Sequence, residues 1–361
     1  MKKSVCLSMI VKDEAMVIVK CLASVKDIID HWVIVDTGSS DGTQKIVEDF
    51  LRNIPGKLYE RPWVDFAFNR NEALALAKDK GDYFLFIDAD ETLEFINSFS
   101  LPMLEKDYYA AILHNKAFLS TRILLVNSHF NWQWNGIIHE VVECPEAKNK
   151  GFLKQAIIRV TLKGNRSRDL LKKNRQDIEL LQRALQKDPQ NGRYRLQLAQ
   201  YYEAGQEYSP ALKNYELRAM MGGADSEIFV SLYRMGLLQK TLKMSSEIFL
   251  NSYAKAFQIC PWRAEPLFFL VEYFLNINAC VLGYLVARFA VNVELFIDYY
   301  LISHEIYDYG LLFQYAECSF RMGKYQEAYE SLKRLLAIEI LPTDIRKVCE
   351  KNFAVLKNNG N

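Results

Sequence analysis

The first half of the chain alternates short apolar runs with segments whose apolar residues recur every three or four positions. The apolar runs have the length of β-strands and occupy residues 5–11, 32–37, 57–60 and 83–88. The first periodic segment places on one helical face Ile18, Cys21, Leu22 and Val25. Two further helices are expected, from about Gln44 and over residues 69–80. This alternation predicts a largely parallel sheet with helices on both faces.

Beyond about residue 166 the strand signals end and helical segments rich in Leu, Ala and Tyr follow. Residues 198–219 and 315–337 share an aromatic-rich helix, a turn and a second amphipathic helix. Their matched residues are Gly205 and Gly323, Tyr208 and Tyr325, and Ala211 and Ala328. The pattern predicts stacked helix pairs, with a plain helical bundle as the alternative. We expect one domain at residues 1–165 and an all-helical domain at residues 166–361.

Composition narrows the class of protein. The 361 residues include 45 basic and 44 acidic side chains, and this balance gives no indication of a nucleic-acid-binding surface. Seven cysteines without CxxC spacing are typical of reduced thiols in a cytoplasmic protein. The N-terminus is better explained as a strand than as a signal peptide. Fifteen uncharged residues between Glu272 and Arg288, fewer than the roughly 20 that cross a bilayer, predict buried helices.

Acidic side chains follow three of the predicted strands at the points where the strands end. Asp13 follows residues 5–11, Asp36 ends the second strand, and Asp88 and Asp90 follow the apolar run before them. Ligands of open α/β sheets bind outside the carboxyl ends of the strands. We therefore expect these carboxylates to lie at one edge of the sheet and to form a ligand site.

The Asp-Ala-Asp segment indicates a metal site. Asp88 and Asp90 could reach one point if the chain bends there, and Mg²⁺ or Mn²⁺ prefers such oxygen ligands together with substrate phosphates. A metal bound there would offset the acids and hold a diphosphate. The alternative is a pair of solvated acids at a strand end.

Three side chains near the other strand ends could contact a nucleotide. Asp36 could accept a hydrogen bond from a base or from a ribose hydroxyl. Lys12 could balance a phosphate or pair with Asp13 or Glu14. Arg70 is expected at a helix start, where free N–H groups and the guanidinium favour a phosphate, with an exposed ion pair as the alternative.

His139 and Glu140 lie in an apolar, strand-like run that follows Trp132, Trp134 and Gly136. Two tryptophans and a glycine upstream favour an aromatic-lined pocket. A half-buried histidine beside a surface glutamate is the simpler interpretation. Adjacent residues of a strand face opposite sides, so both can serve one site only where the strand ends or bulges.

Four segments, in this order and spacing, resemble family-2 glycosyltransferases of the GT-A type: "LSMIVKDE", "VIVDTGSSDGT", "RNEALALAKDKGDYFLFIDADE" and "WNGIIHEVV". The resemblance implies a Rossmann-like, mainly parallel sheet in the first domain. The helical part is similar to a bacterial subgroup in which tetratricopeptide-like (TPR-like) repeats follow the catalytic domain.

That resemblance implies a metal-dependent, inverting hexosyltransferase. The donor would be a nucleotide sugar, a UDP-sugar first of all, and the cofactor Mn²⁺ or Mg²⁺. The acceptor would be a protein, a peptide or a glycan. The helical repeats could form a homodimer or bind a protein partner, and no nucleic acid is implied.

The family's roles carry over to matching positions. Asp88 and Asp90 match the metal and diphosphate motif, and Asp36 matches the first acid after the second strand. The nucleotide-binding positions include Lys12, Asp13 and Arg70. His139 and Glu140 match the family's His-Glu pair, which makes Glu140 the expected general base; Glu91 is the alternative base.

Two positions depart from the family pattern. Thr37 stands where many relatives have a second acid that reads uracil, so uridine specificity is open although Thr37 remains a candidate contact. Leu162 stands where subgroup members have a histidine, which leaves His139 as the imidazole that could complete the metal site. A catalytically degenerate sugar-nucleotide-binding scaffold is therefore the rival function. A nucleotidyltransferase would need a Gly-rich phosphate loop with a lysine, which the sequence lacks.

Overall fold

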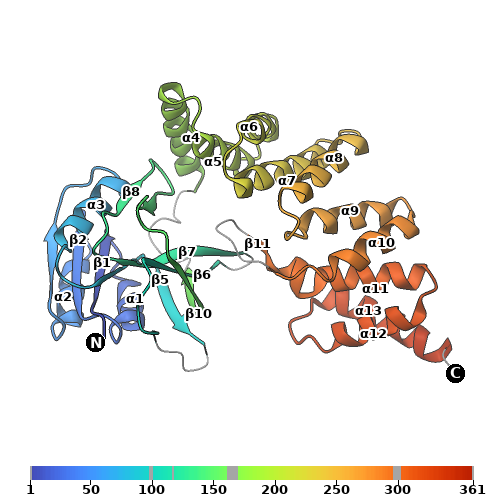
Figure 1. The fold of residues 1–361 in the computed structure, drawn as a ribbon, viewed down its shortest axis with the longest axis horizontal. Coiled ribbons are helices and arrows are strands. Elements are labelled where there is room, and N and C mark those ends of the chain that lie inside the picture. Colours follow the sequence, from blue (N-terminus) through green and yellow to red (C-terminus); the bar gives the residue numbers. More distant parts are fainter. Residues whose placement is uncertain (1, 97–100, 116–117, 161–169, 296–301, 360–361) are drawn as a thin grey trace. The chain divides into compact units, whose positions relative to one another are not determined.

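The structure is a computed structural model that describes residues 2–96, 101–115, 118–160, 170–295 and 302–359 (Figure 1). The chain divides into two compact units, residues 1–180 and residues 181–361. The division falls within α4 (Leu170–Lys187). The expected boundary at residue 165 lies outside the described residues and stays a prediction.

The N-terminal unit is built on a mixed sheet. Its strands run in the order β3-β2-β1-β4-β7-β6-β10-β5. Neighbours from β3 to β4 are parallel, as are β6 and β10, whereas β4–β7, β7–β6 and β10–β5 are antiparallel. The strand bounds are Val5–Val11 (β1), His31–Asp36 (β2), Gly56–Glu60 (β3), Tyr83–Leu85 (β4), Glu91–Phe95 (β5), Tyr108–Asn115 (β6), Phe118–Asn127 (β7) and Lys150–Val160 (β10).

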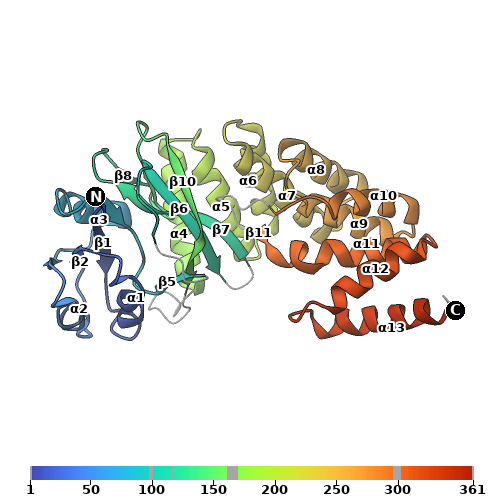
Figure 2. The same cartoon turned by 60° about the horizontal axis from the view of Figure 1, so that its bottom comes forward.

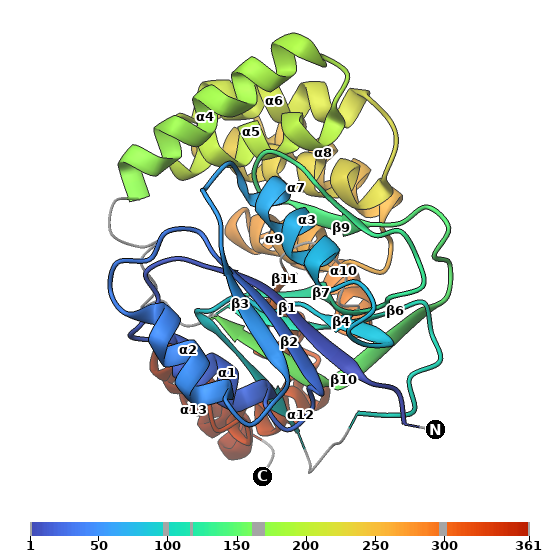
Figure 3. The same cartoon turned by 90° about the vertical axis from the view of Figure 1, so that its left-hand side faces the viewer.

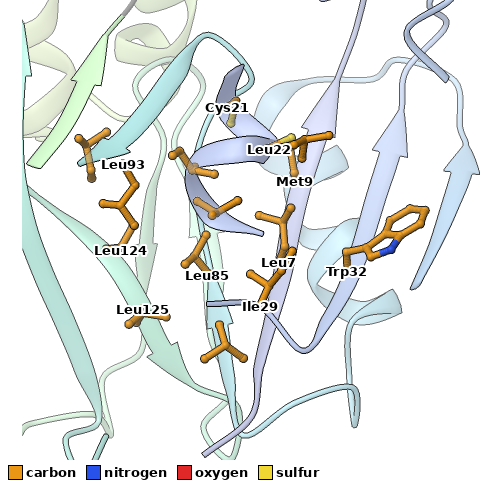
Figure 4. Packing of buried hydrophobic residues seen from close by; sticks show 14 of the residues in the cluster. Leu7, Met9, Cys21, Leu22, Ile29, Trp32, Leu85, Leu93, Leu124 and Leu125 are labelled. Carbon is orange, nitrogen blue, oxygen red and sulfur yellow. The ribbon is translucent and has the colours of Figure 1, made fainter. Parts of the chain in front are cut away.

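Helices cover both faces of the parallel part, as the alternating pattern predicts (Figure 3). Side chains of β1 point alternately to the two faces. Leu7 and Met9 pack with α1 (Ile18–Val25) and α2 (Thr43–Leu51) in one apolar cluster (Figure 4). Cys6 packs on the other face with α3 (Phe66–Leu76). Burial of such side chains, each worth about 1.5–3 kcal/mol, fixes the register of the sheet.

A two-stranded hairpin packs with α3 on that second face. It consists of β8 (Gln133–Asn135) and β9 (Val141–Glu143), paired antiparallel. Trp134 and Val142 of the hairpin join the cluster that contains Leu74 of α3. The segment between the strands is bent and includes Gly136 at φ +120° and His139 at φ +48°. The expected continuous strand is therefore interrupted at His139 and Glu140.

The C-terminal unit consists largely of helices that pack in sequential pairs (Figures 1 and 2). The pairs are α5–α6, α7–α8, α9–α10 and α11–α12, and further helices complete the unit. Their bounds are Gly192–Ala204 (α5), Tyr208–Met220 (α6), Asp225–Thr241 (α7), Ser246–Ile259 (α8), Glu265–Asn276 (α9), Cys280–Ala290 (α10), Ile306–Gly310 (η2, a π-helix), Leu311–Arg321 (α11), Tyr325–Leu336 (α12) and Thr343–Asn359 (α13), with a short strand β11 at Ile302–Ser303.

The turns inside the four pairs have the same geometry, which confirms the repeat. Each contains a left-handed residue: Gln206, Lys243, Asn278 or Gly323. The N–H of the next residue then donates to a carbonyl five positions back, as in a Schellman motif. The first three turns recur at close to the roughly 34-residue period of tetratricopeptide repeats. Gly205 precedes the left-handed position, so the equivalent of Gly323 is Gln206, and the expected match of the two glycines is wrong by one residue.

Two general expectations can be compared with the described residues. All seven cysteines have free thiols. Among the helices that the structure describes, none combines the length and hydropathy needed to cross a lipid bilayer.

Candidate active site

The carboxyl ends of the parallel strands bring the predicted acids to one edge of the sheet. Val11 of β1 and Glu60 of β3 both pair with Asp36, which lies between them on β2. The loops after β1 and β2 are then tied together, because Asp13 accepts a hydrogen bond from Ser40 N–H at 2.7 Å and donates its own N–H to Ser39 Oγ at 2.8 Å. The strand ends therefore form one continuous rim.

The Asp36 side chain is fully buried, and only one of its two carboxylate oxygens has hydrogen-bond partners. Its Oδ1 accepts from the N–H groups of Gly38 at 2.9 Å and Ser39 at 2.8 Å, and from the Gln44 side chain at 3.2 Å. Its Oδ2 is buried and has no hydrogen-bond partner among the described residues. A buried acceptor without a partner costs about 1–3 kcal/mol. A ligand that donates a hydrogen bond would remove that cost.

The other candidate nucleotide contacts at this rim differ from Asp36 in their burial and in their hydrogen bonds. Lys12 is exposed to solvent. Thr37 is buried, and its hydroxyl donates to the Val11 carbonyl at 3.3 Å. Asp13 has a left-handed backbone at φ +52° and uses Oδ1 to join the two loops. Their roles toward a nucleotide stay predictions.

Arg70 is the central cation of the site. Its Nη2 donates to Asp88 Oδ1 at 2.5 Å and its Nε donates to Glu140 Oε1 at 2.7 Å. The guanidinium also lies over the Trp134 ring, 4.7 Å from its centroid. Burial opposes the charge, but Asp88 and Glu140 outweigh it and raise the pKa of Arg70. Residues from a helix, a strand end and the hairpin thus meet at one guanidinium.

The expected place of Arg70 at a helix start is wrong, and so is the alternative of an exposed ion pair. Asp65 is the N-cap of α3 and accepts from Phe68 N–H at 2.7 Å, so the helix begins before Arg70. Arg70 is consequently in the second turn and is only 7% exposed. Its binding capacity rests on its ion pairs rather than on the free N–H groups of a helix end.

Asn71 fixes the hairpin that carries Glu140. Its Nδ2 donates to the Trp134 carbonyl at 2.9 Å, and its Oδ1 accepts from Trp134 N–H at 2.8 Å. One side chain therefore pairs both backbone groups of a residue in β8. The bend that follows places Glu140 against Arg70, whereas the adjacent His139 is exposed.

Glu91 lies behind the Asp-Ala-Asp turn and is bound on both carboxylate oxygens. Arg122 of β7 donates from Nη1 to Oε1 at 2.8 Å and from Nη2 to Oε2. Oε2 also accepts from Asp88 N–H at 2.9 Å. Burial raises the pKa of the Glu91 carboxyl, with Arg122 acting in the opposite direction. These contacts favour a role in holding the turn, and the alternative role of Glu91 as base stays a prediction.

Sequence reasoning missed Arg122, which lies outside the quoted motifs. A single arginine inside the apolar run "STRILLV" was the available signal. Arg122 lies in the strand beside β4 and therefore reaches two acids of the turn, Asp88 and Glu91.

A metal that binds at the Asp-Ala-Asp turn together with a diphosphate stays a prediction. Among the described residues there is no group of three or more His, Cys, Asp and Glu side chains able to hold an ion. Asp88 is flanked by two guanidiniums, with Arg122 Nη1 3.7 Å from Oδ2. Mg²⁺ commonly takes only one or two protein carboxylates and completes its shell with phosphate and water. Asp88 and Asp90 are the carboxylates of the turn that could serve in this way; Leu162 lies outside the described residues.

Comparison with known proteins finds a family match within the N-terminal unit. Residues 6–101 match the model described as glycosyl transferase family 2. A TPR repeat-containing protein of Synechococcus elongatus is 46% identical over 90 residues, which are 25% of this chain and 21% of that protein. An uncharacterized glycosyltransferase of Rickettsia felis is 31% identical over 144 residues, which are 40% of this chain and 47% of the relative. Among solved structures, that of YrrB, a TPR protein with an unusual peptide-binding site, has 15% identity and a TM-score of 0.40 and covers 50% of this chain and 86% of that chain.

The matched region contains most of the site. It runs from β1 to beyond β5 and includes Asp36, Arg70 and Asp88, whereas Arg122 and Glu140 lie outside it. The match to glycosyl transferase family 2 is thus confined to residues 6–101, and the helix pairs with TPR-like turns follow in the C-terminal unit. It spans about half the length of the curated Rickettsia glycosyltransferase and about a fifth of the Synechococcus protein.

Proposed function

We propose that the protein transfers a hexosyl group from a nucleotide sugar to an acceptor nucleophile, with inversion at the anomeric carbon. The observation that carries this proposal is the buried Arg70, which joins Asp88 of the Asp-Ala-Asp turn to Glu140. One guanidinium thereby joins the acid that we propose for the metal diphosphate to the acid that we propose for proton transfer.

The donor would bind along the rim of strand ends. The unpaired Oδ2 of Asp36 accepts a hydrogen bond from the nucleoside, and Arg70 and Lys12 offset the charge of the diphosphate. Mn²⁺ or Mg²⁺, held by Asp90 with Asp88, and with His139 if its ring turns inward, would supply Lewis-acid stabilisation of the leaving diphosphate. Glu91 and Arg122 keep the turn in place.

Transfer would proceed by a single displacement. The acceptor atom forms its bond to the anomeric carbon while the bond from that carbon to the diphosphate oxygen breaks, and the electron pair leaves with the nucleoside diphosphate. Glu140 takes the proton of the acceptor. Arg70 keeps the Glu140 carboxylate directed into the site through its 2.7 Å hydrogen bond.

A donor screen tests the proposal. Purified protein is assayed for turnover of UDP-, GDP- and dTDP-hexoses with Mn²⁺ or Mg²⁺, alone and with peptide or glycan acceptors. Asp90→Ala and Glu140→Gln are expected to lower turnover by at least about a hundredfold. The exposed Asp49→Ala and Glu143→Gln serve as matched controls. Wild-type rates in both site variants would overturn the assignment.

A sugar-nucleotide-binding scaffold is the second candidate, and Thr37 favours it. The Thr37 hydroxyl is committed to the Val11 carbonyl and supplies no acid for base recognition. A scaffold would bind a nucleoside diphosphate with Mn²⁺ and show no turnover of any donor. Protein acceptors, protein partners or self-association through the helix pairs, and a cytoplasmic location, stay predictions.

A further inference from the structure

The loop between β3 and α3 exposes large apolar side chains at the site. In this loop and the first turn of α3, Trp63 is 43% exposed, Val64 53% and Phe68 51%. Single exposed apolar residues are common, but three within six positions concentrate apolar surface on one short segment, which we call the Trp63 patch and which calls for a ligand or partner.

This loop is held rigidly on both sides of Trp63. Asn69 is fully buried; its Oδ1 accepts from Val64 N–H at 3.0 Å and its Nδ2 donates to the Pro62 carbonyl at 3.1 Å. Phe66 contacts the indole edge-to-face, with centroids 4.7 Å apart. The indole is therefore exposed in a fixed backbone setting, and a ligand would meet a preorganised surface.

The loop lies between two contacts with the proposed donor site, one before it in the sequence and one after it. At its start, Arg61 N–H donates to the Asp36 carbonyl at 2.9 Å. Trp63 follows two residues later, at most about 7 Å of extended chain from that contact. Beyond Phe68, the same helix delivers Arg70 to Asp88. The patch thus lies on the stretch of chain that joins Asp36 to Arg70.

We infer that Trp63 stacks on the nucleobase of the donor while Asp36 accepts a hydrogen bond from the same nucleoside. The inference rests on the proposed function and assigns the base-binding surface within it. Two observations converge on this stretch of chain: an exposed indole in a fixed backbone setting, and a buried, unpartnered carboxylate oxygen on Asp36, whose carbonyl is bound by Arg61 two residues before Trp63. A nucleoside supplies both a planar aromatic face and hydrogen-bond donors.

Stacking on Trp63 would also hold a base without the second acid that Thr37 replaces. Every base has an aromatic face, so stacking binds all bases and discriminates weakly among them. Because the Thr37 hydroxyl is bound to Val11, the structure shows no second acid that would select uracil at that position. Base preference is consequently expected to be weak, with UDP and GDP binding within about tenfold of each other.

Calorimetry with UDP, GDP and inorganic pyrophosphate, each with Mn²⁺, tests the inference. Trp63→Ala is expected to weaken UDP and GDP binding about tenfold to a hundredfold, equivalent to the roughly 1–3 kcal/mol of a base stacked on an aromatic side chain. Pyrophosphate binding should be unchanged, and Trp63→Phe should retain UDP binding within about threefold. The matched control is Trp262→Ala, since Trp262 is 44% exposed in the other unit.

Each outcome is decisive. Unchanged UDP binding by Trp63→Ala overturns the inference, and a raised acceptor KM with unchanged UDP binding assigns the patch to the acceptor instead. Equal losses for UDP and pyrophosphate overturn it too, because a base contact cannot affect pyrophosphate. If the wild-type protein binds no nucleoside diphosphate, the proposed function itself fails, and the inference fails with it.

Discussion

Arg122 stands opposite Asp88, with Nη1 3.7 Å from Asp88 Oδ2 and 2.8 Å from Glu91 Oε1. The position follows from the sheet, because β7 runs antiparallel to β4 with Leu125 opposite Leu85, and the pairing continues as Phe86 N–H donates to Leu124 C=O. Three further residues along each strand bring Arg122 beside Asp88.

Replacing Arg122 with glutamine is expected to lower the free energy of unfolding by about 3 kcal/mol near pH 8, because the buried Glu91 carboxylate loses its partner. The pKa of Glu91 is already raised in the folded protein, and removing the opposing charge raises it further. Stability from such a group is present below its unfolded pKa of about 4.3 and is lost as the pH rises through the folded pKa. Urea unfolding should therefore show a smaller deficit at pH 5 than at pH 8.

The double variant with Arg122→Gln and Glu91→Gln is the control for this experiment. It removes both charges and should recover part of the lost stability at pH 8. If Arg122→Gln lost the same free energy of unfolding at pH 5 and at pH 8, the unpaired Glu91 carboxylate would not be the cause of the loss.

Asn71→Ala is expected to reduce kcat about tenfold to a hundredfold while UDP binding changes little. Without its two hydrogen bonds to Trp134, the hairpin loosens and Glu140 is displaced, and small displacements of a base are costly. The matched control is the exposed Asn135→Ala in the same hairpin. Equal effects on kcat and on UDP binding would point to general unfolding instead.

Mn²⁺ and UDP are expected to strengthen each other's binding by about tenfold or more. The described residues hold no three-ligand group that would retain an ion alone, and Asp88 is already balanced by two guanidiniums. The coupling must be reciprocal, so titrations of either ligand with and without the other should give the same factor. Tight binding of Mn²⁺ alone would contradict this expectation.

Gly323→Ala is expected to destabilise the C-terminal unit by about 1 kcal/mol through backbone strain alone. Its φ is +71° and an added Cβ would meet no atom within 4 Å. Gly205→Ala is the control, since its φ of −79° suits any residue, and it should be neutral or slightly stabilising. Thermal unfolding of the two variants would also separate the two glycines that appear equivalent in the sequence.

The parallel half of the sheet and its helices were predictable because their signals are local. The runs before Asp36 and Asp88 are continuous apolar segments buried on both faces, and such runs mark parallel strands. The strands of the mixed half of the sheet, β5, β6, β7 and β10, were not predicted. In β10, exposed residues such as Lys154 and Gln155 interrupt the apolar pattern, and partner choice among these strands depends on contacts distant in the sequence.

The site was predictable as a set of residues and less so as a set of contacts. Residue type and place at a strand end sufficed to select Asp36 and Asp88, whereas Arg70 was selected from an expected helix start that the structure does not bear out. The pairing of Arg70 with Glu140 required the bend between β8 and β9, and nothing in the local apolar pattern indicated that bend. Arg122 reaches Asp88 only through tertiary register.

One turn of α3 links the parts of the site mechanically. Three consecutive side chains leave the helix in different directions: Asn69 holds the Trp63 loop, Arg70 holds the acids, and Asn71 holds the hairpin. A small rotation of that turn would shift all three contacts together. A donor that contacts the Trp63 loop would thus be linked to Glu140 through one rigid turn, without any direct contact between the donor and the hairpin.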